Sequence, residues 1–138
     1  MLRLLAQDPD DMEVISAALQ DAVTKIGDIH WDAKARSVTI AFNRFRWEAE
    51  RRRGERVRAG LQVGGVLDVK SRRLRQDAKS AVLELLAVAF EPGEAPGGTI
   101  AFTFAGGGDL AVSVECVDAA LADLSDPWPT PRKPAHEG

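Results

Sequence analysis

Most of this chain alternates apolar and polar residues one by one, and that period of two limits what it can fold into. Every second residue is apolar in the stretches 38–42, 57–63, 100–104 and 110–116. Successive side chains of a strand point to opposite faces, so the pattern predicts strands with one buried and one exposed face. Three glycines at 106–108 separate the last two stretches. Those two stretches therefore form the clearest predicted hairpin in the sequence.

The period changes near the N-terminus, where the residues favour a helix. Asp8 can cap the first free amides, and Pro9 suits the first helical position. Apolar residues then recur at steps of three and four, which predicts an amphipathic helix over 9–21. The apolar run 2–6 that precedes it predicts an edge strand.

One strand meets a charged residue where the alternation calls for an apolar one. Strict alternation beyond Phe42 would send Arg44 into the core, where an isolated charge is costly. A bulge near Asn43 that turns Phe45 and Trp47 inward avoids this cost. We therefore expect a bulge at this point of the strand.

The C-terminal half adds a long apolar run and a second helix. Residues 81–90 are almost continuously apolar, which predicts a central strand covered on both faces, one of them by the N-terminal helix. Cys116 falls at an inward strand position and is expected to be buried. Asp118 can then cap a short final helix with Leu121 and Leu124 turned inward.

Together these elements predict one α+β domain over 1–125, followed by a proline-rich extended tail over 126–138. The domain has an N-terminal helix, about seven mostly antiparallel strands in a bent sheet or half-barrel, and a short C-terminal helix. This order is similar to the pleckstrin-homology-like superfold. The alternative is one open, curved antiparallel sheet with both helices on one face.

Composition indicates the cellular compartment in which the protein is expected. The chain of 138 residues has a net charge of −3 and a single cysteine, so an intramolecular disulfide is excluded. No apolar run approaches the roughly 20 residues of a membrane span, and no secretory leader is recognisable. We therefore expect a cytoplasmic protein without membrane contact, and we expect no cofactor.

The charge is unevenly distributed along the chain. Residues 44–75 contain eleven basic and four acidic side chains, so the rest of the chain carries the negative balance. The basic stretch can pair with that acidic remainder, or it can form a surface for an anionic protein or small molecule. Its most plausible contact residues are Arg44, Arg46, Arg56, Arg58 and Arg73. The acidic balance and the small number of aromatic residues argue against nucleic acid.

A second group of polar residues offers a different chemistry. Asp28, His30 and Asp32 fall on one face of a predicted strand, where two carboxylates and an imidazole could hold a divalent metal or tune a general base. Neighbours on one face of a strand stand about 6.5–7 Å apart, so a straight strand cannot close all three on one ion. A polar outer face beside a turn explains the same residues.

Several segments resemble a bacterial family, found in alphaproteobacteria, whose domain has no known function. The resemblance spans residues 2 to about 128 and supports a cytoplasmic bacterial protein, but it implies no activity and no catalytic residues. The segments that carry it are 10–16, 19–22, 43–48, 56–61, 90–93 and 115–116.

The sequence therefore leaves two functions open. The first is a non-enzymatic binding or scaffold module that contacts an anionic ligand or protein through the arginine-rich surface. The second is a small hydrolase, metal-dependent or acid/base, that uses Asp28, His30 and Asp32. Formation of a homodimer through an open strand edge is compatible with both.

Overall fold

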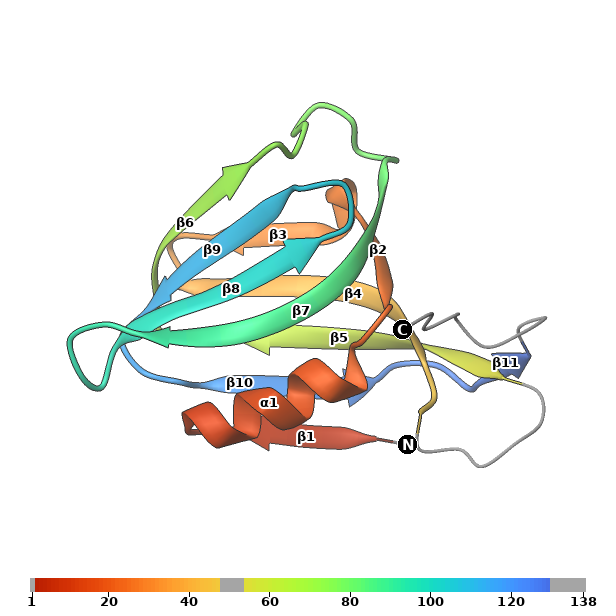
Figure 1. Ribbon diagram of the computed structural model, residues 1–138, viewed down its shortest axis with the longest axis horizontal. Coiled ribbons are helices and arrows are strands. Elements are labelled where there is room, and N and C mark those ends of the chain that lie inside the picture. Colours follow the sequence, from red (N-terminus) through yellow and green to blue (C-terminus); the bar gives the residue numbers. More distant parts are fainter. Residues whose placement is uncertain (1, 48–53, 130–138) are drawn as a thin grey trace.

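The computed structural model describes residues 2–47 and 54–129, which form an antiparallel sheet of eleven strands and one α-helix (Figure 1). The helix α1 spans Pro9–Ala18, and a 3-10 turn, η1, spans Ile26–Asp28. The strands are β1 (Arg3–Ala6), β2 (Val23–Lys25), β3 (Ile29–Asp32), β4 (Ser37–Phe45), β5 (Glu55–Val63), β6 (Val66–Arg72), β7 (Val82–Pro92), β8 (Gly98–Phe104), β9 (Asp109–Val114), β10 (Ala119–Asp123) and β11 (Trp128–Pro129).

The strands follow the order β1-β10-β5-β4-β2-β7-β8-β9-β6, with β3 beside β4 and β11 beside β5. The sheet bends so strongly that β7 and β8 cross in front of β4 (Figure 1). The short strand β2 joins the two parts, because it pairs with β7 through three residues and with β4 only at Val23 opposite Asn43. The seam at β2 is therefore the narrowest part of the sheet.

The core lies between the two parts of the bent sheet, as the period of two predicts. Inward residues of β4, β5, β8 and β9 are almost fully buried, and α1 adds Met12 and Ile15 to the same cluster. The hairpin of β8 and β9 is confirmed by an unbroken register from Gly98 opposite Val114 to Thr103 opposite Asp109. Burial of these alternate apolar side chains is the main force that holds the two parts together.

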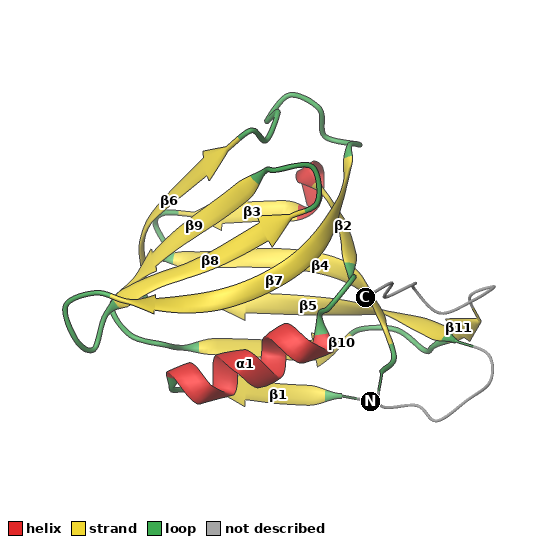
Figure 2. Ribbon diagram, viewed as in Figure 1, coloured by secondary structure: helices red, strands yellow, loops and turns green. Residues whose placement is uncertain are grey.

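The helix α1 covers one end of the core and packs against β1 and β7 (Figure 2). Asp8 caps it by accepting a hydrogen bond from the Asp11 N–H at 2.8 Å, and Pro9 is its first residue, both as predicted. The helix ends at Ala18 and not at 21, because the chain reverses at Asp21 with a positive φ of 61° and enters β2.

The expected fold class is wrong, because the described residues form eleven strands and one α-helix instead of about seven strands and two helices. The difference in helices lies at the C-terminal end. Residues 119–123 form β10, which is inserted between β1 and β5, and no second α-helix occurs in the described ranges. Ala119 and Leu121 are inward and buried, whereas Leu124 is 61% exposed and not part of any helix. The likeness to the pleckstrin-homology-like superfold and the arrangement with two helices on one face both fall with the missing helix.

The expected bulge near Asn43 is also absent. The pairing of β4 with β5 runs without a shift from Val38 to Phe45, and Arg44 continues the inward alternation with 0% exposure. Phe45 is buried as well, edge-to-face against Trp47 at 4.6 Å between ring centres. The charge is accommodated by a partner from another strand, as described below.

Two further expectations on burial fail. The run 81–90 does form one long strand, β7, but its outer side chains reach solvent: Val82 is 62% and Leu86 48% exposed. It is therefore covered on one face only. Cys116 is exposed, because β9 ends at Val114 and the alternation ends with it.

Candidate functional site

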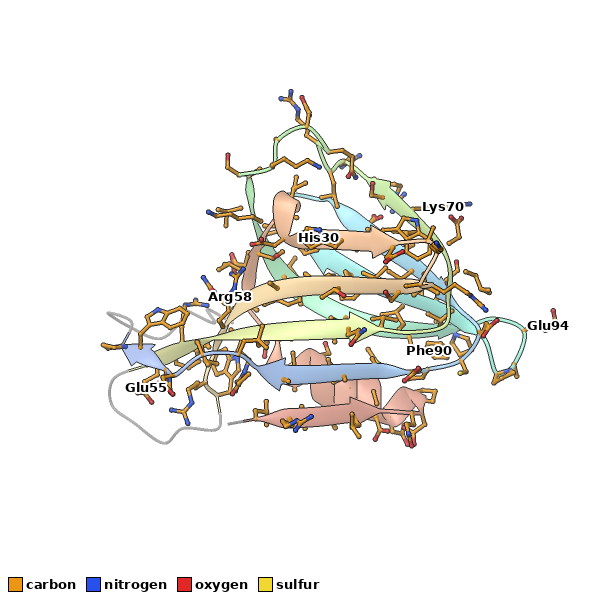
Figure 3. All side chains as sticks on the ribbon, turned by 180° about the vertical axis from the view of Figure 1, so that it is seen from behind. His30, Glu55, Arg58, Lys70, Phe90 and Glu94 are labelled. Atoms are coloured by element: carbon orange, nitrogen blue, oxygen red, sulfur yellow. The ribbon has the colours of Figure 1, made fainter. Side chains whose placement is uncertain are left out.

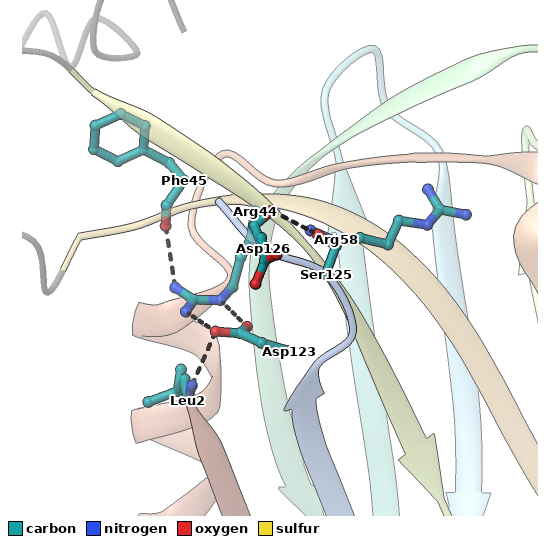
Figure 4. Close-up of polar contacts among 7 residues, drawn as sticks. All are labelled: Leu2, Arg44, Phe45, Arg58, Asp123, Ser125 and Asp126. Carbon is teal, nitrogen blue, oxygen red and sulfur yellow. Dashed lines mark hydrogen bonds and ion pairs between the residues drawn. The ribbon is translucent and has the colours of Figure 1, made fainter. Parts of the chain in front are cut away.

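Arg44 belongs to the core and not to a contact surface. Its Nε and Nη2 donate to the two carboxylate oxygens of Asp123 on β10 at 2.8 and 2.9 Å, and its Nη1 donates to the Phe45 carbonyl at 3.3 Å (Figure 4). Asp123, whose side chain is 3% exposed, also accepts the Leu2 N–H at 2.9 Å. Burial opposes ionisation of Asp123, but the bonds from Arg44 and Leu2 and the charge of Arg44 hold its pKa below the usual range.

Several of the other described basic residues are paired with acidic residues. Arg46 bonds to Glu55 at 2.6 Å, and Arg72 bonds to Asp109 on the neighbouring strand at 2.6 Å. Arg73 is exposed beside the 106–108 turn, away from the other predicted contact residues. The structure therefore divides the predicted arginine surface, and it favours internal pairing for much of it.

Arg56 and Arg58 are brought together, on the outer face of β5. The Arg56 Nη1 donates to the Asn43 carbonyl at 3.2 Å, and desolvation lowers the pKa of its guanidinium despite the nearby charges of Asp21 and Glu84. Arg58 reaches across β4 to the Asn43 side-chain oxygen and to a carboxylate oxygen of Asp28, both at 3.2 Å. Both arginines thus contact Asn43, the residue of β4 that pairs with β2.

A pocket of about 350 Å³ opens beside Arg58. It is lined by polar side chains of Lys25, Asp28, Asn43 and Arg58, together with Val23, Thr24 and Val82. Two cations and one carboxylate give the lining a net positive charge. The Arg58 contact with Asp28 is a single 3.2 Å contact between side chains that are 37% and 30% exposed, so this pair is weaker than the bidentate pair at Arg44. We call these residues the Arg58 pocket.

The predicted metal residues do not assemble. His30 and Asp32 lie on the exposed side of β3, whereas Asp28 lies in η1 and is engaged with Arg58 (Figure 3). Within the described ranges, no three His, Cys, Asp or Glu side chains are placed to hold a metal ion. The geometry thus gives no support to the metal-dependent hydrolase.

A second hollow, which the sequence did not indicate, lies between α1 and β7. One part has a volume of about 330 Å³ and is lined by Met12, Glu13, Ser16 and Val88 with Pro9, Ala89 and Phe90. The other part has a volume of about 290 Å³ and shares Pro9 and Phe90 with the first. It continues to the 92–97 loop, Cys116 and Val117. We call the combined hollow the α1–β7 groove.

The fold and these two hollows define a class: a small antiparallel β protein in which the described residues form one α-helix, set against a strand edge. The chain belongs to the family DUF2948, described as a protein of unknown function, which it matches over residues 2–136. The resemblance to a family of unknown function that spans nearly the whole domain is thereby confirmed. Comparisons with curated proteins and with solved structures find no match. No helix of the described residues is long and apolar enough to cross a membrane.

Proposed function

We propose that the protein is a non-enzymatic binding module that holds a small anionic group in the Arg58 pocket. The observation that carries this proposal is the loose ion pair of Arg58 in a positively lined pocket of about 350 Å³. Pockets of small-molecule ligands start at about 300 Å³. The resemblance noted above and the single cysteine lead us to propose a bacterial cytoplasm as its setting.

The chemistry of the pocket favours a carboxylate or phosphate. A guanidinium binds such groups through two parallel hydrogen bonds, and a partly exposed arginine with one long ion-pair contact can exchange partners at little cost. Lys25 adds a second cation, and Asn43 adds an amide that is already aligned by Arg58. A bound anion would share Arg58 with Asp28, which limits the affinity.

Nuclear magnetic resonance titration of the full chain tests this proposal. We expect citrate, succinate or inorganic phosphate to shift the side-chain amide of Asn43 and the backbone amide of Lys25. A tri-glutamate peptide distinguishes a protein carboxylate from a free small anion. Arg58→Gln and Lys25→Gln should each weaken binding about tenfold, the order expected for one charge-assisted contact.

The matched control is Arg72→Gln, because Arg72 is also paired with an aspartate but lies at the far end of the sheet. That variant should bind as the wild type does. Binding that survives both pocket substitutions, or that falls equally in the control, would refute the Arg58 pocket as the site. The absence of any shift with all four probes at 20-fold excess over a ~1 mM protein sample, where even millimolar affinities are detectable, would refute the function.

A further inference from the structure

We propose that the α1–β7 groove binds an extended, lysine- or arginine-bearing peptide segment of a partner protein, which adds as a strand to the open edge of β7. This interaction surface is separate from the Arg58 pocket and does not depend on the proposed anion ligand. It rests on an unpaired strand edge, on the shape of the groove beside it, and on the charge around it.

The edge of β7 is open over its second half. β7 pairs with β8 along one side, from Leu85 to Pro92. On the other side it pairs with β2 from Val82 to Glu84, and Leu85 still exchanges backbone hydrogen bonds with Asp21 and Ala22. Beyond that point no strand of the described ranges pairs with this edge. An open edge presents a row of backbone donors and acceptors that an extended chain can use.

The direction of these backbone groups follows from one contact. The Val88 N–H donates to the Ser16 hydroxyl of α1 at 3.0 Å, so it points away from β8. Backbone groups alternate along a strand, so the N–H and carbonyl of Phe90, two residues on, point the same way. Pro92 adds a carbonyl but has no N–H. An incoming strand therefore finds its anchor at Phe90, just past the Ser16 contact.

The room beside this edge of β7 is bounded by α1, whose Ser16 contacts the edge at Val88. Helix α1 runs along this side of β7 and closes it against a second strand layer (Figure 1). The sheet edge of another copy would carry its own neighbouring strand about 4.8 Å further out, where α1 stands. A single extended chain that enters beyond the Ser16 contact, beside Phe90 and Pro92, needs no such second layer. It can also place one apolar side chain in the part of about 290 Å³ beside Pro96 and Val117.

The charge around the groove selects the occupant. The two segments that border it, 7–16 and 86–97, contain six carboxylates and no lysine or arginine. Glu13 is exposed and lines the groove, and Glu94 stands on the loop near the Phe90 end (Figure 3). An acidic rim attracts basic segments and disfavours acidic ones. The occupant is therefore a basic peptide with an apolar residue.

The test is amide NMR titration of the full chain with two six-residue acetylated peptides. One alternates lysine with valine, and the other alternates glutamate with valine. We expect the lysine peptide to shift the Phe90 amide, and to bind at least about tenfold more tightly than the glutamate peptide, a difference of about 1.4 kcal/mol. Cys116 is the only cysteine of the chain and lines the groove, so the lysine peptide should also slow its reaction with a thiol reagent.

Two substitutions at exposed positions, each with a control, distinguish the effect of the charge at the groove from the effect of its shape. Glu13→Lys should weaken the lysine peptide about threefold or more, while Asp10→Lys, on the same helix but not in the groove lining, should weaken it clearly less. Cys116→Phe should fill the groove and weaken both peptides, whereas Cys116→Ser should not. Circular dichroism confirms that each variant is folded.

Equal affinity for the two peptides would overturn the charge argument. Shifts that spare Phe90, or a Cys116→Phe variant that binds as the wild type does, would overturn the groove as the site. A peptide-independent dimer in sedimentation experiments, with the Phe90 amide protected, would show that a second copy is the occupant and would also overturn the proposal.

Discussion

Removing one member of the buried Arg44–Asp123 pair should destabilise the protein far more than removing both. In Asp123→Ala, the Arg44 guanidinium loses two hydrogen bonds in a site with 0% exposure, and the Leu2 N–H loses its acceptor. Breaking a buried ion pair by removing one partner costs about 3–5 kcal/mol, out of about 5–15 kcal/mol for a whole domain. We therefore expect a loss of about 4 kcal/mol in Asp123→Ala.

The double variant Arg44→Met with Asp123→Leu removes both charges and keeps most of the volume. Apolar replacement of a buried ion pair is often neutral, and the Leu2 N–H left without its acceptor adds about 1–3 kcal/mol. Urea unfolding followed by tryptophan fluorescence measures the wild type, Arg44→Met, Asp123→Leu and the double variant, which together form a closed double-mutant cycle. A coupling free energy below about 1 kcal/mol, or a single variant as stable as the wild type, would refute the reasoning.

Three further outcomes follow from individual contacts. Asp8→Ala removes the cap on the Asp11 N–H and should lower the free energy of unfolding by about 1 kcal/mol in the same assay. Arg72→Ala breaks an exposed ion pair with Asp109 and should leave the unfolding midpoint unchanged, since water screens such pairs; a clear shift would contradict this. The pKa of Asp123 is lowered in the folded state, so its contribution to stability is present above the unfolded pKa and is lost as the pH falls through the folded one. Asp123→Asn should therefore flatten the acid limb of the stability–pH profile measured by urea unfolding, and an acid limb as steep as that of the wild type would count against this assignment.

The strands that were predicted well are those whose neighbours in sequence are also their neighbours in space. The hairpin of β8 and β9 needs only its own alternation and the glycine turn, in which Gly106 and Gly107 adopt φ values of 90° and 95°. The helix α1 was predicted for a similar reason, because Asp8 and Pro9 act within its first turn. Such elements can be predicted from the sequence, because the residues that determine them lie within the element itself.

The segment 119–123 was misread because its state is set by distant strands. Alanine and leucine favour a helix in isolation, but β1 and β5 each leave an edge that only this segment fills. Pairing of Leu121 with Leu4 on one side and with Leu61 on the other outweighs the small intrinsic preference. The sequence contains the alternation Ala119, Leu121 and Asp123. However, nothing near this segment in the sequence shows that β1 and β5 each have an unpaired edge with which it can form a strand.

The alternation of inward and outward residues also indicates the buried Arg44–Asp123 pair, which the sequence analysis missed. Carried forward strictly, the period of two puts Arg44 inward on β4 and Asp123 inward on β10. Two opposite charges at extrapolated core positions indicate a pair, although they stand 79 residues apart. The Arg58 pocket was found only in part, because Asn43 and Lys25 come from strands whose pairing the sequence did not show. Nothing in the sequence indicated the α1–β7 groove. The groove exists because β2 pairs with only the first part of β7, and sequence alternation does not show where that pairing stops.

The two proposed sites take ligands of opposite charge, and β7 is the one strand that both contact. Val82 lines the Arg58 pocket, whereas Phe90 lines the α1–β7 groove, and the register shift between Leu85 and Ala87 lies between them. Coupling between ligands requires an element whose two states both ligands bias. A twisted strand anchored by β8 along its whole second half is not free to move at one end alone. Citrate at the Arg58 pocket should therefore leave the affinity for the lysine peptide unchanged once ionic strength is matched, and a reciprocal shift in both affinities would instead mean that the seam at β2 moves.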